Sequence, residues 1–315
     1  MRVIALEEHF LTPAMAEGLA GRPAPATLRR KLEDLGEERL ADMDAGGIDY
    51  QVIGHTTPGS QGLAGEEAIA LARDANDRLA NAVRRHPDRF GGFATLPTSD
   101  PDAAAEELRR AKQELGFVGA MINGPTGGRF LDDSIFRPLL AEAERLQLPI
   151  YLHPAEPPAV VRDAYFRGFD AAVEFFLSSA AWGWHSETGL HVLRLILGGV
   201  FDHFPQLQLI IGHMGEMLPF MLSRIDDVLP PTRARLERPV SDYLRSNLHI
   251  TTSGIFTLPP LLCALMVLGV ERIMFSVDYP YSSNETGSAF LATAAISPAD
   301  IQLITHRNAE RLLGL

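Results

Sequence analysis

Short apolar segments of strand length recur along the chain, and longer segments with helical periodicity separate them. Most of the short segments are continuously apolar rather than alternating with polar residues, which is typical of parallel strands covered on both faces. The pattern therefore predicts a parallel sheet. Its expected strands are residues 2–10, 50–54, 90–96, 117–122, 149–154, 207–213, 248–253 and 272–278.

The segments between these strands predict helices. Asp100-Pro101 marks one helix start, because proline fits the first helical turn, and Gly46-Gly47 marks one helix end. Residues 12–28, rich in Pro, Gly and Ala, predict a loop with a helical turn. The expected helices are residues 29–45, 66–85, 100–115 and 134–146, two within 169–203, one running on from Met214, then 258–268 and 297–313.

Strands and helices alternate eight times, which predicts an α/β fold of the (β/α)8 TIM-barrel type. No linker-like change of composition divides the chain, so we expect residues 1–315 to form a single domain. An open, doubly wound sheet is the alternative. It is less favoured because no glycine fingerprint follows the first strand.

Charge and composition narrow the possible partners. The net charge of −12 argues against nucleic acid or an anionic membrane as the main partner, but not against a small anionic substrate. No apolar run is long enough to span a membrane, and the N-terminus leads straight into a strand without a signal peptide, so we expect a cytoplasmic protein. The single cysteine, Cys263, excludes a disulfide within the chain.

Polar residues stand where several of the apolar strands end. Glu7 and His9 end the first strand, and they share one face because strand side chains alternate. His153, His213 and Asp278 end the fifth, sixth and eighth strands. Active sites of these barrels lie at the carboxyl ends of the strands, so the five groups converge on one rim and indicate a metal centre.

Each of these residues has another interpretation when taken alone. Glu7 and His9 could end an amphipathic edge strand, and His153 could be a hydrogen-bonded core histidine. His213 could bind a backbone carbonyl, and Asp278 could cap the next segment. Five such groups at one rim are costly to bury unless they are paired, so the metal interpretation explains them better together.

Several motifs in the chain are similar to those of the amidohydrolase superfamily. They resemble most closely its metal-dependent aromatic-acid decarboxylases, the group of gamma-resorcylate and 2,3-dihydroxybenzoate decarboxylases. A glutamate in the first-strand motif is informative, because most superfamily members have H-x-H there. The motifs are ALEEHF at 5–10, YLHP at 151–154, GHMGE at 212–216, HITTSG at 249–254, FSVDYP at 275–280 and NAERL at 308–312.

The resemblance implies one divalent ion, Zn2+ or Mn2+, and a homodimer or homotetramer. Binuclear members bridge two ions with a carboxylated lysine on a strand, whereas Lys31 and Lys112 both lie in predicted helices. A single ion is therefore expected. Its implied ligands are Glu7, His9, His153 and Asp278.

The resemblance also implies a reaction, the non-oxidative decarboxylation of an ortho-hydroxybenzoate. Asp278 would deliver a proton to the ring carbon that carries the carboxylate, and His213 would orient the substrate or stabilise developing charge. Glu216 could hold His213 in one tautomer or only favour a helix start. Arg224 could bind the substrate carboxylate or lie on the surface, and Asn123 could bind a substrate hydroxyl or form a turn.

A second function uses the same scaffold. A metal-dependent hydrolase of a lactone, amide or ester would use Asp278 as a base that activates water. The glutamate on the first strand and the missing strand lysine favour the decarboxylase. A binding protein that has lost catalysis is less consistent, because every expected ligand is present. The loops after the first, second and eighth strands depart from the family pattern, so the ring substituents are not predicted.

Overall fold

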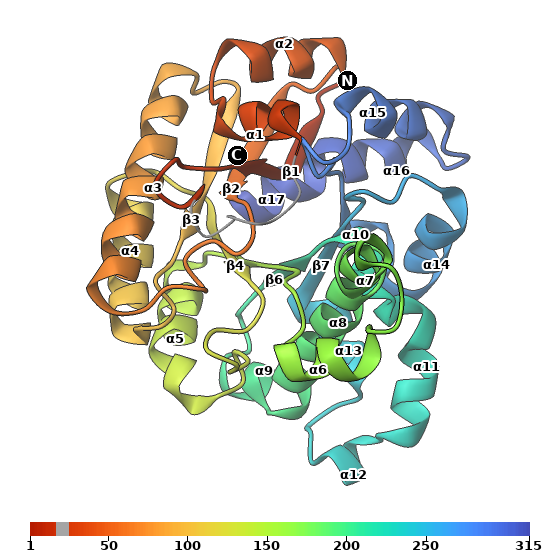
Figure 1. Ribbon diagram of the computed structural model, residues 1–315. Coiled ribbons are helices and arrows are strands. Elements are labelled where there is room, and N and C mark those ends of the chain that lie inside the picture. The colour runs from red at the N-terminus through yellow and green to blue at the C-terminus, as the bar shows by residue number, and fades with distance from the viewer. Residues whose placement is uncertain (17–24) are drawn as a thin grey trace.

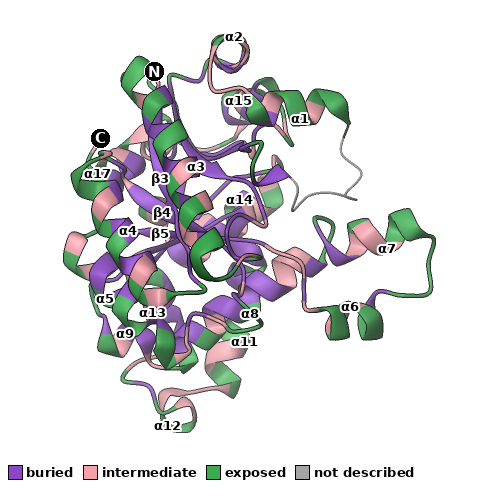
Figure 2. Ribbon diagram, turned by 60° about the vertical axis from the view of Figure 1, so that its left-hand side comes forward, coloured by how far each residue is buried: buried purple, intermediate pink, exposed green. Residues whose placement is uncertain are grey.

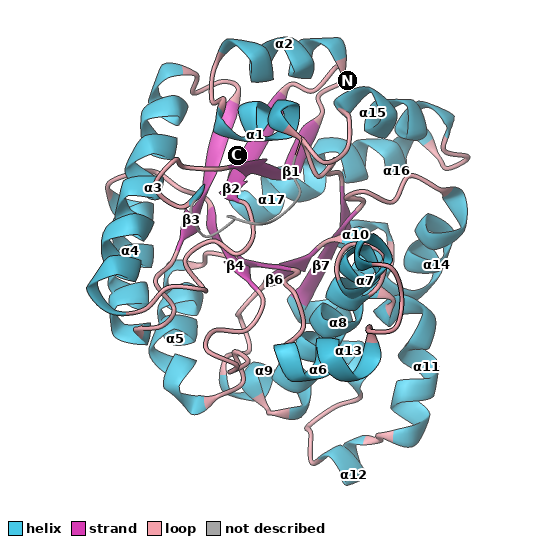
Figure 3. Cartoon of the chain, viewed as in Figure 1, coloured by secondary structure: helices cyan, strands magenta, loops and turns pink. Residues whose placement is uncertain are grey.

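The computed structural model describes residues 1–16 and 25–315, so the loop predicted at 12–28 lies partly outside the described residues. Eight parallel strands run in sequence order around a barrel, as Figures 1 and 3 show, and confirm the predicted fold class. None of the described helices is long and apolar enough to cross a membrane. The strands are β1 (Ile4–Phe10), β2 (Tyr50–His55), β3 (Phe90–Thr95), β4 (Gly119–Asn123), β5 (Ile150–His153), β6 (Leu209–Ile211), β7 (Leu248–Thr251) and β8 (Ile273–Met274).

Helices surround the strands on the outside of the barrel (Figure 3). In the first half they are α1 (Ala26–Glu33), α2 (Glu37–Ala45), α3 (Gly65–Arg85), α4 (Pro101–Gln113), α5 (Arg137–Leu146), α6 (Ala159–Tyr165) and α7 (Ala171–Ser178). In the second half they are α8 (Gly183–Leu197), α9 (Val200–His203), α10 (His213–Glu216), α11 (Leu218–Val228), α12 (Pro231–Ala234), α13 (Val240–Asn247), α14 (Leu258–Leu268), α15 (Asn284–Thr293), α16 (Pro298–Gln302) and α17 (Asn308–Leu313).

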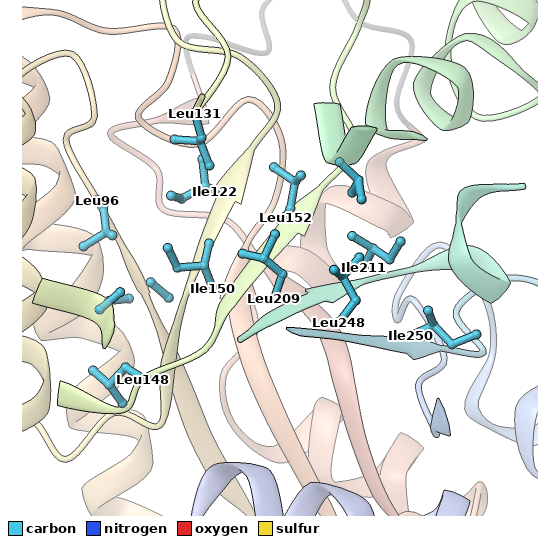
Figure 4. Close-up of a cluster of buried hydrophobic side chains, with 14 of the residues drawn as sticks. Leu96, Ile122, Leu131, Leu148, Ile150, Leu152, Leu209, Ile211, Leu248 and Ile250 are labelled. Carbon is cyan, nitrogen blue, oxygen red and sulfur yellow. The ribbon is translucent and has the colours of Figure 1, made fainter. Parts of the chain in front are cut away.

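Alternate side chains of the strands pack into two apolar layers. On β5, Tyr151 faces the barrel interior, while Ile150 and Leu152 face the surrounding helices. Figure 4 shows the outer layer, in which aliphatic side chains from β4 to β7 lie side by side. Both layers are buried, which explains why the strands read as continuous apolar runs.

The barrel closes differently at one interface. Backbone ladders join each consecutive pair of strands from β1 to β8. Within the described ranges no ladder joins β8 to β1. The His9 N–H donates to the Tyr279 carbonyl at 2.7 Å, and other bonds across this seam come from side chains.

Several predicted helices differ from the observed ones. The helix expected at 29–45 is broken into α1 and α2. Residues 34–36 leave the helix, and the Asp34 carboxylate accepts the Arg39 backbone N–H in the first turn of α2 at 2.7 Å. Residues 169–203 form three helices rather than two. The helix expected at 297–313 divides into α16, a π-helical turn and α17, and β8 keeps only two residues of the predicted strand.

Helices α6 and α7 form an arm that projects from the barrel (Figure 2). We call residues 159–178 the arm. Its apolar side chains are largely exposed, with Val160 and Tyr165 about three-quarters accessible and Phe176 more than half. Apolar residues of this size are normally buried in a core, so these side chains form an apolar surface that the described residues do not cover.

Candidate metal centre

The carboxyl ends of β1, β5 and β8 bring the four residues predicted as metal ligands into one cluster. One donor atom from each of Glu7, His9, His153 and Asp278 lies within 4.8 Å of the others. His9 Nε2 lies 3.2 Å from Asp278 Oδ1, and His153 Nε2 lies 3.2 Å from Glu7 Oε1. Residues nearly 270 positions apart in sequence therefore meet at one barrel mouth, where catalytic groups of this fold lie.

The polar atoms of this cluster fit a cation. Within the described part of the chain, His9 Nδ1 is buried without a partner. Glu7 Oε1 and His9 Nε2 are buried too, and although they lie 3.2 Å from His153 and Asp278 they form no well-aligned hydrogen bond. Buried polar atoms of this kind are costly unless something binds them. Burial lowers the pKa of His9, which favours the neutral imidazole that metals require. Two imidazoles and two carboxylates form a donor set that Zn2+ and Mn2+ both accept.

Glu7 is anchored from the interior of the barrel. The Tyr151 hydroxyl donates to Glu7 Oε2, and Thr251 Oγ1 lies 2.9 Å from the Tyr151 oxygen. Burial raises the pKa of Glu7, but the nearby His213 and His153 outweigh it, so that pKa lies well below its ordinary value. Glu7 is therefore ionised, with one oxygen held inside the barrel and the other facing the cluster.

Asp278 has a left-handed backbone conformation with φ +71°, which is uncommon for a residue with a side chain. Its Oδ2 lies 3.9 Å from His213 Nε2. Burial raises the pKa of Asp278, but the interactions with the nearby imidazoles of His213 and His9 outweigh burial and lower it. Asp278 is therefore a carboxylate in this state, and it must receive a proton before it can donate one.

A left-handed turn places His213 beside Glu216. The backbone φ is positive at every residue from His213 to Met217, and the helix predicted from Met214 becomes regular only in α11. A left-handed conformation costs a non-glycine residue about 1–2 kcal/mol, so such a run persists only where its surroundings hold it. Here it directs the Glu216 carboxylate to His213, with Oε1 2.9 Å from Nδ1.

Glu216 lies between two histidines. Its other oxygen, Oε2, lies 2.7 Å from His185 Nδ1, and His185 Nε2 lies 2.8 Å from the Ala180 carbonyl oxygen. Burial lowers the pKa of His213, but the charges of Glu7 and Glu216 outweigh it and raise that pKa well above its ordinary value. His213 is therefore a cationic donor whose Nδ1 is committed to Glu216 and whose Nε2 faces the cluster.

The two residues predicted to bind the substrate, Asn123 and Arg224, lie in different environments. Asn123 ends β4 in register with His153, and its buried Oδ1 has no partner among the described residues. Arg224 is exposed on α11, and no hydrogen bond or ion pair joins it to the described residues. The Trp184 ring lies 6.4 Å from the His153 ring, and its indole N–H is buried without a described partner.

Sequence reasoning assigned no role to three side chains that support the cluster, namely Glu8, Arg39 and Tyr151. Tyr151 lies two positions before His153, so strand alternation alone could have placed its hydroxyl on the same face. Arg39 gave no such signal, because it lies in a charged helix and its partners are on distant strands. Glu8 points away from the cluster, toward the segment after β8.

The sequence of this chain is similar to those of known proteins. The amidohydrolase family model matches residues 9–315. A decarboxylase of Emericella nidulans, orsB, is 41% identical over 99% of this chain and 96% of its own length. The gamma-resorcylate decarboxylase of a Rhizobium species is 40% identical over 99% of this chain and 98% of its own length.

Solved structures agree with these relatives. A 2,6-dihydroxybenzoate decarboxylase in complex with 2,6-dihydroxybenzoate superposes with a TM-score of 0.92, at 38% identity, and the match covers 100% of both chains. A dihydroxybenzoic acid decarboxylase from a Polaromonas species, with bound manganese and 2-nitroresorcinol, gives a TM-score of 0.93 at 35% identity, over 100% of this chain and 97% of that one.

Proposed function

The chain belongs to the amidohydrolase family, and we propose that it is a carboxy-lyase that removes CO2 without oxidation from a hydroxylated aromatic acid. One observation carries the proposal. Glu7, His9, His153 and Asp278 meet at the barrel mouth of a chain that is about 40% identical, over nearly its full length, to gamma-resorcylate decarboxylases. Residues 1–315 would form one catalytic domain.

Glu7, His9, His153 and Asp278 would hold a single divalent ion. Manganese is the first candidate, because it is bound in the similar decarboxylase from Polaromonas, and Zn2+ suits the same donors. When bound, the cation would act as a Lewis acid toward the hydroxyl and carboxylate oxygens of an ortho-hydroxybenzoate.

Asp278 would supply the proton. Because its pKa is lowered, it would take this proton during substrate binding, and the ortho hydroxyl of the substrate is the available source. Asp278 would then protonate the ring carbon that bears the carboxylate, which interrupts aromaticity. The bond to the carboxylate breaks, its electron pair returns to the ring, and CO2 leaves, so no oxidant or reductant is consumed.

His213 and nearby polar groups would orient the substrate. The His213 cation, fixed by Glu216, would donate from Nε2 to a substrate oxygen and stabilise charge that develops there. Asn123 Oδ1, which has no partner among the described residues, would accept from a ring hydroxyl. The Trp184 indole would form an aromatic wall, and its N–H, also without a described partner, could donate to the substrate. Arg224 is exposed, so it would bind the substrate only if a substrate group extended to its position. Its role in substrate binding stays a prediction.

We also infer a homodimer or homotetramer. The exposed apolar side chains of the arm support this inference, because a second copy would remove them from water. A cytoplasmic location remains a prediction from the sequence.

An assay of metal content and product distinguishes the two reactions. Protein dialysed against a chelator should lose activity, and stoichiometric Mn2+ should restore CO2 release from one or more dihydroxybenzoates in a panel. Reloaded protein that releases no CO2 from any of them but opens lactones would replace the proposal with the hydrolase. If the protein binds no divalent ion, the proposed metal centre is wrong.

A further inference from the structure

The seam between β8 and β1 divides the candidate metal centre. Glu7 and His9 lie on β1, and Asp278 lies four residues after β8 ends. Within the described ranges this is the one pair of neighbouring strands without a backbone ladder. One backbone hydrogen bond, from the His9 N–H to the Tyr279 carbonyl at 2.7 Å, crosses the seam, so the other constraints on the distance between these two groups of ligands come from side chains.

The Glu8 carboxylate bridges this seam with both of its oxygens. Oε1 accepts the Val277 N–H at 3.0 Å and the Ser276 hydroxyl at 3.2 Å, and Oε2 accepts the Tyr279 N–H at 3.0 Å. The two backbone donors stand immediately before and after Asp278. The carboxylate therefore holds the chain on both sides of a residue whose φ of +71° is unfavourable without such support.

Two further contacts connect the same strands. The Ser276 hydroxyl that donates to Glu8 also accepts the Glu7 N–H at 2.6 Å. From α2, the buried Arg39 guanidinium donates to the His9 carbonyl oxygen at 2.5 Å and lies 4.8 Å from the centre of the Tyr279 ring. Arg39 thus contacts the backbone of His9 and the side chain of Tyr279, the residue after Asp278.

We propose that Glu8 is a positioning residue of the metal centre, which replaces the missing ladder and sets the distance between Glu7 and His9 on one side and Asp278 on the other. The inference rests on the proposed metal-dependent function. Glu8 contacts neither the cluster nor a substrate position directly. It acts through the backbone at residues 276–279, where outer contacts commonly tune metal affinity by about 10- to 100-fold.

The Glu8→Gln variant tests this role. Glutamine keeps the shape of the side chain but replaces one acceptor oxygen with an NH2 group, which would face a backbone N–H that also donates. Metal-free protein titrated with Mn2+ by calorimetry should show an affinity about 10- to 100-fold weaker than that of the wild type. This readout needs no substrate and no turnover.

Glu107→Gln is the matched control. Glu107 is equally buried, but it binds Asn76 and Arg110 among the outer helices, away from the seam. It should lower the unfolding temperature and leave Mn2+ affinity unchanged. If Glu8→Gln behaves in the same way, Glu8 only supports the fold and the positioning role is wrong.

A milder variant covers the case in which Glu8→Gln does not fold. Ser276→Ala removes the hydroxyl between Glu7 and Glu8 and should weaken Mn2+ binding several-fold, whereas wild-type affinity in folded Ser276→Ala protein would overturn the inference. Failure of the proposed function looks different. In that case wild-type protein binds no Mn2+, or it binds Mn2+ with Glu8-dependent affinity and releases no CO2.

Discussion

At the scale of single residues, the position of the Glu7 carboxylate depends on the absence of a side chain at Gly212. Gly212 follows β6 with φ −80° and ψ −167°, a conformation that any residue adopts. A β-carbon built there would lie 2.4 Å from Glu7 Oε2, the oxygen that Tyr151 holds. Glycine is therefore needed at position 212 because the Glu7 carboxylate occupies the space of a side chain, and not because the backbone conformation requires it.

This close approach predicts the effect of Gly212→Ala. The added methyl group should displace the Glu7 carboxylate and weaken Mn2+ binding at least 10-fold, the size expected when a ligand is misdirected. The backbone permits alanine, so circular dichroism of the variant should match the wild type. Gly62→Ala is the control, because a β-carbon there meets no atom closer than 3.9 Å. Unchanged Mn2+ affinity in Gly212→Ala would show that Glu7 does not bind the ion.

The residues of the cluster could be predicted from the sequence because strand ends and alternation are local properties. Glu7, His9, His153 and Asp278 each end an apolar run, and the barrel brings such ends together. The role of Glu8 could not be predicted in this way. Its partners depend on how β8 meets β1, and no local pattern reports a contact across 269 residues.

At the scale of elements, two outer helices are joined by a carboxylate with two arginine partners. Glu142 on α5 accepts from Arg145 of the same helix and from Arg109 on α4, each at 2.7 Å. The hydrogen bond from Arg145, followed by that from Arg109, lowers the pKa of Glu142 to about 2 from its ordinary 4.5. In the unfolded chain the same group binds a proton at higher pH.

This difference predicts how stability depends on pH. Between about pH 4.5 and pH 2 the unfolded state binds more protons at Glu142 than the folded state, so its stabilising effect is full above this window and is lost as pH falls through it. Urea unfolding should show wild type more stable than Glu142→Gln at pH 6, with the difference closing toward pH 2. The exposed Glu106→Gln on α4 should show no such convergence. A constant difference at every pH would contradict the assignment.

Helix existence was easier to predict than helix ends. Periodicity located α3 and α14 almost to the residue, because each is one uninterrupted helix. The break between α1 and α2 depends on the Asp34 side chain binding a backbone N–H five residues ahead, which periodicity does not register. The left-handed run at residues 213–217 is likewise held by its surroundings rather than by local preference.

At the scale of the whole molecule, the barrel follows from eight alternations of strand and helix, whereas the arm does not. Phe169 and Phe176 in and beside the two arm helices are each 56% exposed. The sequence of α7 is as apolar as that of a core helix, and only the structure shows that the described residues leave these two side chains exposed on an arm that projects from the barrel (Figure 2).

The arm predicts the outcome of a charge substitution. Phe169→Asp combined with Phe176→Asp should reduce the mass measured by light scattering to that of one chain, because two buried charges without partners are incompatible with an apolar interface. Met266→Asp, at a position on α14 that is 87% exposed, should leave the mass unchanged. Wild-type protein that already has the mass of one chain, or a double variant that still assembles, would exclude the arm as the interface.

Closure of the barrel by its first and last strands also determines when the centre can be assembled. The oxygens of Glu8 find their partners 268 to 271 positions later. A polypeptide still emerging from the ribosome exposes Glu7 and His9 long before Asp278 has been translated. An ion held by the four proposed ligands would therefore meet only part of its coordination sphere if it arrived early, and we expect stable uptake only by the finished protein.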